Sequence, residues 1–193
     1  HLMATYGRQA ISFVRGRGAY LYTADGTEYL DALTGIAVCG LGHAHPVIAE
    51  AIAEQAATLV HTSNLFEIPW QTAAAQKLAE VSGMEEIFFS NSGAESNEGA
   101  IKIARKFGAQ QGIVNPKILV AEQSFHGRTL ATLSATGNKK VQEGFAPLVQ
   151  GFIRVPFGDV EAIQEAAIHH PDIVAILIEP IQGEGGVNTA PQG

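Results

Sequence analysis

The sequence contains very little cysteine and no long apolar run. Its single cysteine, Cys39, cannot form a disulfide within the chain, which favours a reducing compartment and a cytoplasmic protein. No segment approaches the roughly 20 consecutive apolar residues needed to cross a bilayer, and the N-terminus lacks the basic-then-apolar layout of a secretory signal. We therefore expect a soluble protein with no membrane partner.

Positive charge is also scarce. The 193 residues include 12 basic and 19 acidic side chains, for a formal net charge of −7. Such a chain offers no broad positive field to a phosphate backbone, so no nucleic-acid partner is expected. The seven histidines show no metal-ligand spacing and there is no cysteine pair, so no metal site is expected either.

The N-terminal segment, residues 1–60, has the pattern of a β-hairpin followed by a helix. Residues 19–23 and 27–31 are rich in aromatic and β-branched side chains and flank the turn Asp25-Gly26. Pro46 can begin a helix, because apolar residues recur after it at helical spacing. A second helix is predicted over residues 71–81.

The rest of the chain, residues 61–193, alternates short apolar strands with helices and reads as part of a larger domain. Uniformly apolar strands require cover on both faces, which predicts an α/β architecture with a mostly parallel sheet and flanking helices. Strands are predicted at 86–90, 117–121, 152–155 and 173–178, and helices at 95–106, 128–134 and 160–168.

The stretch from residue 90 to 98 leaves a predicted strand and enters a helix through small residues. Free backbone N–H groups and the positive end of the helix dipole would face one point, Gly93 admits a ligand to the backbone, and Ser92 adds a hydroxyl. A phosphate group is the natural ligand. The alternative is a helix cap that serves packing alone. The stretch lacks the glycine fingerprint of dinucleotide sites and the Walker lysine pattern, which disfavours a nucleotide-binding domain.

Two further stretches follow predicted strands and so open at the same end of the sheet, where ligands of α/β folds collect. In the first, Phe125 can stack on a flat ring and Arg128 can grip a carboxylate. In the second, Glu179 and Glu184 flank a glycine-rich loop and could hold a cation or a substrate nitrogen. The ordinary alternatives are a core Phe, a surface Arg and exposed loop glutamates.

These stretches, in this order, resemble the landmarks of the class-III aminotransferases of the aspartate aminotransferase fold, fold type I. The matching segments are 22–31, 42–46, 92–95, 125–129 and 179–186. The resemblance implies a pyridoxal-phosphate-binding large domain, of which this chain holds an incomplete, N-terminal portion.

The resemblance also implies roles for particular residues. Ser92 and the backbone of Gly93 and Ala94 would hold the cofactor phosphate, and Phe125 would stack on the pyridine ring. The substrate-binding residues would be Arg128, which binds the α-carboxylate, together with Glu184, Tyr6 and Ile36.

Residues 34–38 are similar to the version found in the acetylornithine aminotransferases of this family. The implied reaction moves the δ-amino group of N-acetylornithine to 2-oxoglutarate through pyridoxal 5'-phosphate, in arginine biosynthesis. The alternatives are an ornithine, succinylornithine or 4-aminobutyrate aminotransferase, or a non-catalytic fragment that binds the cofactor or a phosphate.

The family's Schiff-base lysine, and the aspartate that pairs with the pyridinium nitrogen, are expected beyond Gly193, so no catalytic residue is assigned within this sequence. The family resemblance suggests a homodimer. The 193-residue chain alone is predicted to show no transaminase turnover, and cofactor-dependent turnover by material of verified length would contradict this.

Overall fold

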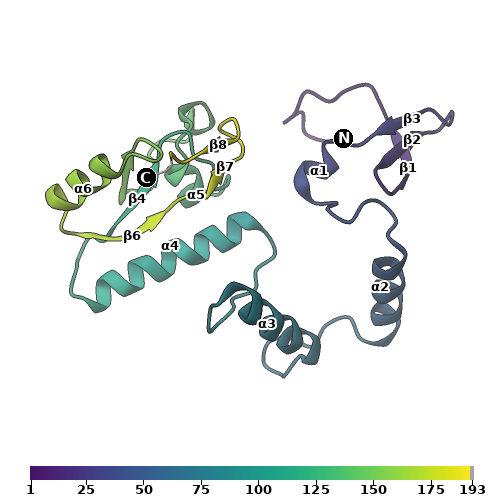
Figure 1. The fold of residues 1–193 in the computed structure, drawn as a ribbon, viewed down its shortest axis with the longest axis horizontal. Helices are drawn as coiled ribbons and strands as arrows, with labels where there is room; N and C mark the ends of the chain where they lie inside the picture. The colour runs from purple at the N-terminus through teal and green to yellow at the C-terminus, as the bar shows by residue number, and fades with distance from the viewer. Residues whose placement is uncertain (192–193) are drawn as a thin grey trace. The chain divides into compact units, whose positions relative to one another are not determined.

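The computed structural model describes residues 1–191. These form two compact units, residues 1–77 and the residues from 78 onward (Figure 1). The domain division predicted after residue 60 stays a prediction.

The first unit begins with a three-stranded antiparallel sheet of β1 (Phe13–Arg17), β2 (Tyr20–Thr23) and β3 (Glu28–Leu30). The turn between β2 and β3 depends on Gly26, whose φ of 87° favours glycine. The Gly26 amide donates a hydrogen bond to the Thr23 carbonyl at 3.0 Å. The predicted hairpin is confirmed. Strand β1, with two arginines and a glycine among its five residues, was not predicted.

Three helices follow the hairpin: α1 (Thr34–Ala37), α2 (Pro46–Thr58) and α3 (Pro69–Ser82). Helix α2 begins at Pro46 as predicted, since proline is favoured where the backbone N–H has no intrahelical partner. Helix α3 begins two residues before the predicted start, also at a proline. Among the described residues, no helix is both long and apolar enough to cross a membrane.

The second unit is built on a parallel sheet with the strand order β5-β4-β6. Its strands are β4 (Lys117–Ala121), β5 (Phe152–Val155) and β6 (Ile173–Leu177). A two-stranded antiparallel pair, β7 (Ile181–Gln182) and β8 (Asn188–Thr189), follows β6. The predicted α/β architecture with a parallel sheet is therefore confirmed.

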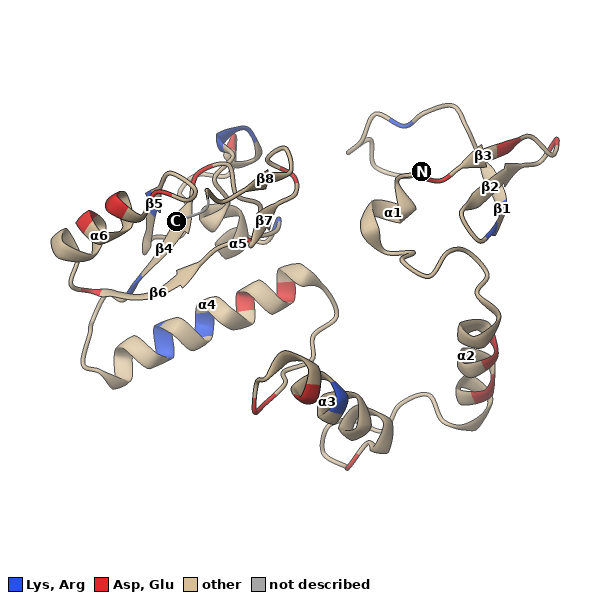
Figure 2. Ribbon diagram, in the orientation of Figure 1, with Lys and Arg blue, Asp and Glu red and all other residues tan. Residues whose placement is uncertain are grey.

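The helices of this unit are α4 (Gly93–Gln110), α5 (Leu130–Ala135) and α6 (Val160–His169), with a short 3-10 helix, η1 (Lys139–Gln142). Helix α4 lies alongside β6 in Figure 1. In Figure 2 the acidic residues of α4 lie in its N-terminal half and the basic residues in its C-terminal half. This arrangement complements the helix dipole and stabilises α4.

The strand predicted at residues 86–90 is wrong, because this segment pairs with no strand in the described part of the chain. Phe88, in the middle of the segment, is largely exposed. Apolar composition favours a strand only where a neighbouring strand supplies the ladder of hydrogen bonds, and the three paired strands of the parallel sheet all lie later in the sequence.

Helix α4 offers a matched test of the core. Ile101 is 2% exposed and packs with Ile118, whereas Ile103 on the same helix is 65% exposed. We expect Ile101→Ala to lower the free energy of unfolding of this chain by roughly 2–5 kcal/mol, because truncation of a buried isoleucine leaves a cavity. The control Ile103→Ala should change it by less than about 1 kcal/mol. Equal losses in urea unfolding would contradict the described packing.

Candidate functional site

The first predicted stretch lies at the N-terminus of α4. Ser92 has extended backbone angles and caps the helix, since its Oγ accepts a hydrogen bond from the Glu95 amide at 3.2 Å. The Glu95 carboxylate in turn accepts from the Asn91 amide at 2.6 Å. Because the first turn of a helix has no internal acceptors, the N–H groups of Gly93 and Ala94 remain available to a ligand. Helix α4 is thus capped by Ser92 and still presents two backbone N–H donors to a ligand.

Gly93 leaves open space beside these donors. A Cβ atom built on Gly93 would meet no atom within 4 Å. The packing of the described chain does not require glycine here, so the space is free for an anion. Helix dipole, amide donors and the Ser92 hydroxyl proton all favour negative charge at this point.

The second predicted stretch is the loop that leaves the carboxyl end of β4. Its turn is fixed by buried Ser124, whose hydroxyl donates to the Ala121 carbonyl at 2.7 Å. Phe125 is half-buried, and the exposed Arg128 places its guanidinium carbon 5.9 Å from the Phe125 ring centre. An aromatic face and a cation therefore lie next to each other at the end of the sheet.

This loop packs directly against the N-terminal end of α4. The side-chain amide of Asn97 donates to the His126 carbonyl at 2.7 Å. Gly127 has a φ of 134°, and a Cβ atom there would lie 3.1 Å from the Ala94 Cβ and 2.6 Å from Thr132 Oγ1. Only glycine allows so close an approach. The structure thus brings Ala94, at the start of α4, and the loop of Phe125 and Arg128 together.

The third predicted stretch joins the same region through Glu179, which follows β6. One carboxylate oxygen accepts from the Phe125 amide at 3.0 Å and the other from the Gly183 amide at 3.4 Å. Glu179 therefore holds backbone groups, and the idea that it holds a cation or a substrate nitrogen is not supported by these contacts. Phe125 and Glu184 line one cavity of about 300 Å³. Its other lining residues are Gln123, Ser124, Gly137, Asn138, Lys139 and Gly185.

His126 was not singled out from the sequence, yet it is the most buried ionisable residue of the loop, at 3% exposure. Its amide donates to Thr136 Oγ1 at 3.0 Å, and its Nε2 atom is buried without a hydrogen-bond partner in the described structure. Burial lowers the pKa of His126; the charge of Glu179 opposes this and that of Arg154 adds to it. Its place between Phe125 and Arg128 was the one signal available in the sequence.

The lowered pKa of His126 makes the stability of the chain depend on pH. In the unfolded chain the imidazole gains a proton near its ordinary pKa of 6.5, whereas in the folded chain it stays neutral to lower pH. The unfolded state then binds more protons, so stability falls as the pH drops from 6.5 towards the folded-state pKa. We expect His126→Gln to reduce this loss, measured as urea unfolding midpoints between pH 5 and 7.5. An unchanged pH profile would contradict it.

Tyr6 and Ile36, the other two residues assigned to substrate binding, lie in the first unit, and their roles stay predictions. Both side chains are exposed. Ile36 has a φ of 61°, which is unusual for a β-branched residue and is a feature of strained, functional segments.

In the same unit His43 Nε2 lies 2.6 Å from an Asp31 oxygen, and this contact, with backbone amides, lowers the pKa of Asp31.

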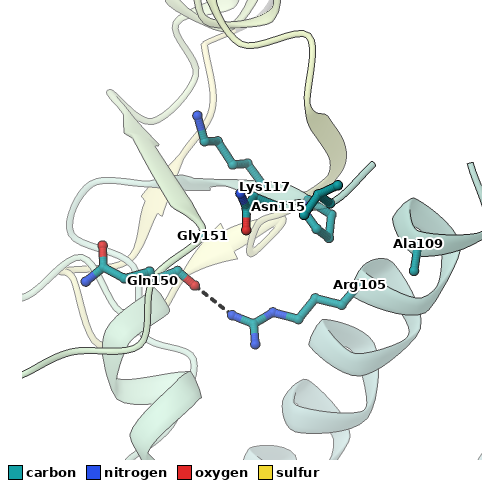
Figure 3. Close-up of a pocket in the computed structure, with 8 residues that line it drawn as sticks. Arg105, Ala109, Asn115, Lys117, Gln150 and Gly151 are labelled. Atoms are coloured by element: carbon teal, nitrogen blue, oxygen red, sulfur yellow. Dashed lines mark hydrogen bonds between the residues drawn. The ribbon is translucent and has the colours of Figure 1, made fainter. Parts of the chain in front are cut away.

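A second cavity lies at the opposite, amino end of β4 (Figure 3). Arg105 donates to the Gln150 carbonyl there at 2.6 Å, and Lys117 forms an ion pair with Asp172 at 3.0 Å. Both basic groups are therefore engaged by the protein itself. Across residues 1–191, no group of three or more His, Cys, Asp or Glu side chains is arranged to hold a metal ion.

The sequence matches a known family over nearly its whole length. The model of the family described as Aminotransferase class-III matches residues 3–193. An acetylornithine aminotransferase of Nitrosomonas europaea is 56% identical over 188 residues, which cover 97% of this chain and 48% of that protein. The chain thus spans about half the length of the curated relatives it matches.

Solved structures agree with the match. The ornithine aminotransferase of Toxoplasma gondii has a TM-score of 0.93 at 32% identity, with 99% of this chain and 46% of that one covered. A second structure of that enzyme reports partial occupancy of PLP at its active site. The N-acetylornithine aminotransferase of Stenotrophomonas maltophilia has a TM-score of 0.78 at 38% identity, covering 96% of this chain and 46% of that one.

Proposed function

The chain belongs to the class-III aminotransferases, and from this we propose that it is part of an enzyme that transfers the δ-amino group of N-acetylornithine to 2-oxoglutarate. The cofactor of the family is pyridoxal phosphate. The choice of amine donor is supported by relatives that are 50–56% identical and are acetylornithine aminotransferases. We further propose that the complete protein works in arginine biosynthesis, as a cytoplasmic homodimer.

One observation carries the proposal: the N-terminal end of α4, the proposed phosphate site, packs against the loop that bears Phe125 and Arg128. The Asn97 to His126 hydrogen bond and the close approach of Gly127 to Ala94 make this contact. Hydrogen-bond donors for a phosphate, an aromatic face and a guanidinium then lie in one region. This set matches a ligand that is a phosphorylated heteroaromatic ring bound beside a substrate carboxylate.

The residues present fit pyridoxal phosphate. The amides of Gly93 and Ala94 and the hydroxyl of Ser92 would bind the phosphate, since the space beside Gly93 is open. The Glu95 carboxylate, the nearest acidic group on α4, is already bound to the Asn91 amide. Phe125 would cover one face of the pyridine ring. When bound, the cofactor supplies an electron sink for cleavage of bonds to the substrate carbon that bears the amino group.

The protein's own part is to bind and orient. Arg128 would hold the α-carboxylate of N-acetylornithine by two parallel hydrogen bonds and so bring the remote δ-amino group to the cofactor. In 2-oxoglutarate, the carboxylate at a comparable distance is the one remote from the keto carbon. Phe125 would fix the tilt of the ring against which the substrate is aligned. Glu184 lines the same cavity as Phe125. It would pair with a distant arginine of the complete protein, as in the family. Tyr6 and Ile36 would contact the amine donor.

A second candidate, ornithine aminotransferase, is favoured by the similarity of fold to the Toxoplasma enzyme. The test is kcat/KM of the complete protein for N-acetylornithine, ornithine, succinylornithine and 4-aminobutyrate, each with 2-oxoglutarate. A preference for N-acetylornithine of about tenfold or more would support the proposal, and a preference for another donor would replace it. If none is converted although pyridoxal phosphate binds, the protein is a non-catalytic binder.

A further inference from the structure

Two side chains from distant parts of the chain hold the backbone on either side of the peptide bond that joins Phe125 and His126. Glu179, after β6, accepts from the Phe125 amide at 3.0 Å, and Asn97, on α4, donates to the His126 carbonyl at 2.7 Å. The contacts span 54 and 29 residues of sequence. The loop is therefore held from the β6 side and from the α4 side at once.

These bonds replace the ones that regular structure would supply. Residues 125 and 126 lie outside any helix or strand, and the amide between them, that of His126, donates to the Thr136 hydroxyl at 3.0 Å. Buried backbone groups need partners, so the conformation of the loop depends on three side chains. Removal of one of them leaves a buried amide or carbonyl unpaired and frees the backbone to rotate.

Glu179 also reaches the third stretch of the site. Its second carboxylate oxygen accepts from the Gly183 amide at 3.4 Å, one residue before Glu184. Phe125 and Glu184 line the same cavity. A single carboxylate thus ties the backbone that carries the aromatic ring to the backbone that carries the glutamate.

We propose that Asn97 and Glu179 are positioning residues for the cofactor site: they act through the Phe125–His126 backbone, and Glu179 also through the loop of Glu184. Neither side chain needs to touch cofactor or substrate, since both are engaged with backbone groups. Their task is to keep the Phe125 ring at one tilt and Arg128 within reach. This proposal rests on the proposed function, insofar as the aligned ligand is pyridoxal phosphate.

Two isosteric substitutions, Asn97→Asp and Glu179→Gln, and one truncation, Glu179→Ala, test the hydrogen bonds. Asn97→Asp keeps the shape but removes the donor and places a carboxylate against the His126 carbonyl. Glu179→Ala removes both acceptors, whereas Glu179→Gln retains one acceptor oxygen for the Phe125 amide. The matched controls are Gln110→Glu, the same amide-to-acid change on α4, and Glu165→Ala on α6; both side chains are exposed.

The experiment is a titration of the cofactor-free complete protein with pyridoxal phosphate, followed by the circular dichroism of the bound cofactor. We expect Asn97→Asp and Glu179→Ala to raise the Kd about tenfold and to reduce the dichroism per bound cofactor, because the ring loses its fixed tilt. Glu179→Gln should recover most of both, and the two controls should match the parent protein. Unchanged Kd and dichroism in both Asn97→Asp and Glu179→Ala would overturn the proposal.

Amide hydrogen exchange in the cofactor-free protein gives an independent reading. In the parent protein the Phe125 amide should be protected, and in Glu179→Ala its exchange should be at least about tenfold faster, with unchanged exchange in β4. Faster exchange throughout β4 would mean general unfolding and would overturn a positioning role. If the parent protein binds no pyridoxal phosphate, the proposed function fails. Faster exchange in Glu179→Ala that is confined to residues 124–129 would still show that Glu179 holds this loop.

Discussion

Replacement of Gly93 by aspartate is expected to weaken the binding of pyridoxal phosphate to the complete protein about a hundredfold or more. The new side chain occupies the open space beside the helix N-terminus and sets a carboxylate against the cofactor phosphate. A hundredfold loss is about 2.7 kcal/mol, within what two charge-assisted hydrogen bonds contribute. Fluorescence titration of the cofactor-free protein measures it.

The fold should tolerate this change, which makes the result specific. A Cβ atom at Gly93 meets nothing within 4 Å, and an acidic residue in the first turn is favourable to a helix. The control is Gly93→Asn, which has the same size and no charge and should lose less affinity. If aspartate leaves the Kd unchanged while the protein stays folded, the N-terminus of α4 is not the phosphate site.

Replacement of Arg128 by glutamine is expected to lower kcat/KM for both the amine donor and 2-oxoglutarate by about a hundredfold, through KM in the main. Each substrate would lose a bidentate carboxylate contact, N-acetylornithine through its α-carboxylate and 2-oxoglutarate through the carboxylate remote from its keto carbon. The Kd for pyridoxal phosphate should change little. Steady-state kinetics with each substrate varied in turn, together with a cofactor titration, measures the effect.

A matched control for this change is Arg105→Gln. Arg105 belongs to the same unit but lines the cavity at the amino end of β4, where it donates to the Gln150 carbonyl (Figure 3). Its loss should leave both KM values unchanged. If Arg128→Gln raises the KM of only one substrate, Arg128 does not bind a carboxylate of both substrates. If it mainly weakens cofactor binding, its contact with the Phe125 ring is the part that matters.

Much of the fold could be predicted because its signals are local. Apolar runs identified β4, β5 and β6, Pro46 marked the start of α2, and the Asp25-Gly26 turn marked the hairpin. The failure at residues 86–90 has a physical reason: a strand is defined by its neighbour, and a single sequence does not contain that information. The same holds for β1, which exists because it pairs with β2.

In the candidate site, too, only the residues with local sequence signals could be predicted. Ser92, Gly93 and Phe125 could be singled out because small residues at a helix start, or an aromatic residue after a strand, have local meaning. The hydrogen-bond partners of Glu179 and Asn97 could not be predicted, since each bond joins segments that are far apart in the sequence. Burial of His126 was hidden for a related reason: the Thr136 hydroxyl that binds its amide comes from the end of α5.

The central place of β4 in the sheet affects the order in which this region becomes functional. β4 is flanked by β5 and β6, and the Phe125 loop obtains its Glu179 partner only after β6 has joined the sheet. Parallel pairing of strands so distant in sequence is slow, because loop closure precedes any gain in contacts. During synthesis on the ribosome, cofactor capture should therefore begin only after the segment of β6 and Gly183 has emerged, well after helix α4, the proposed phosphate site.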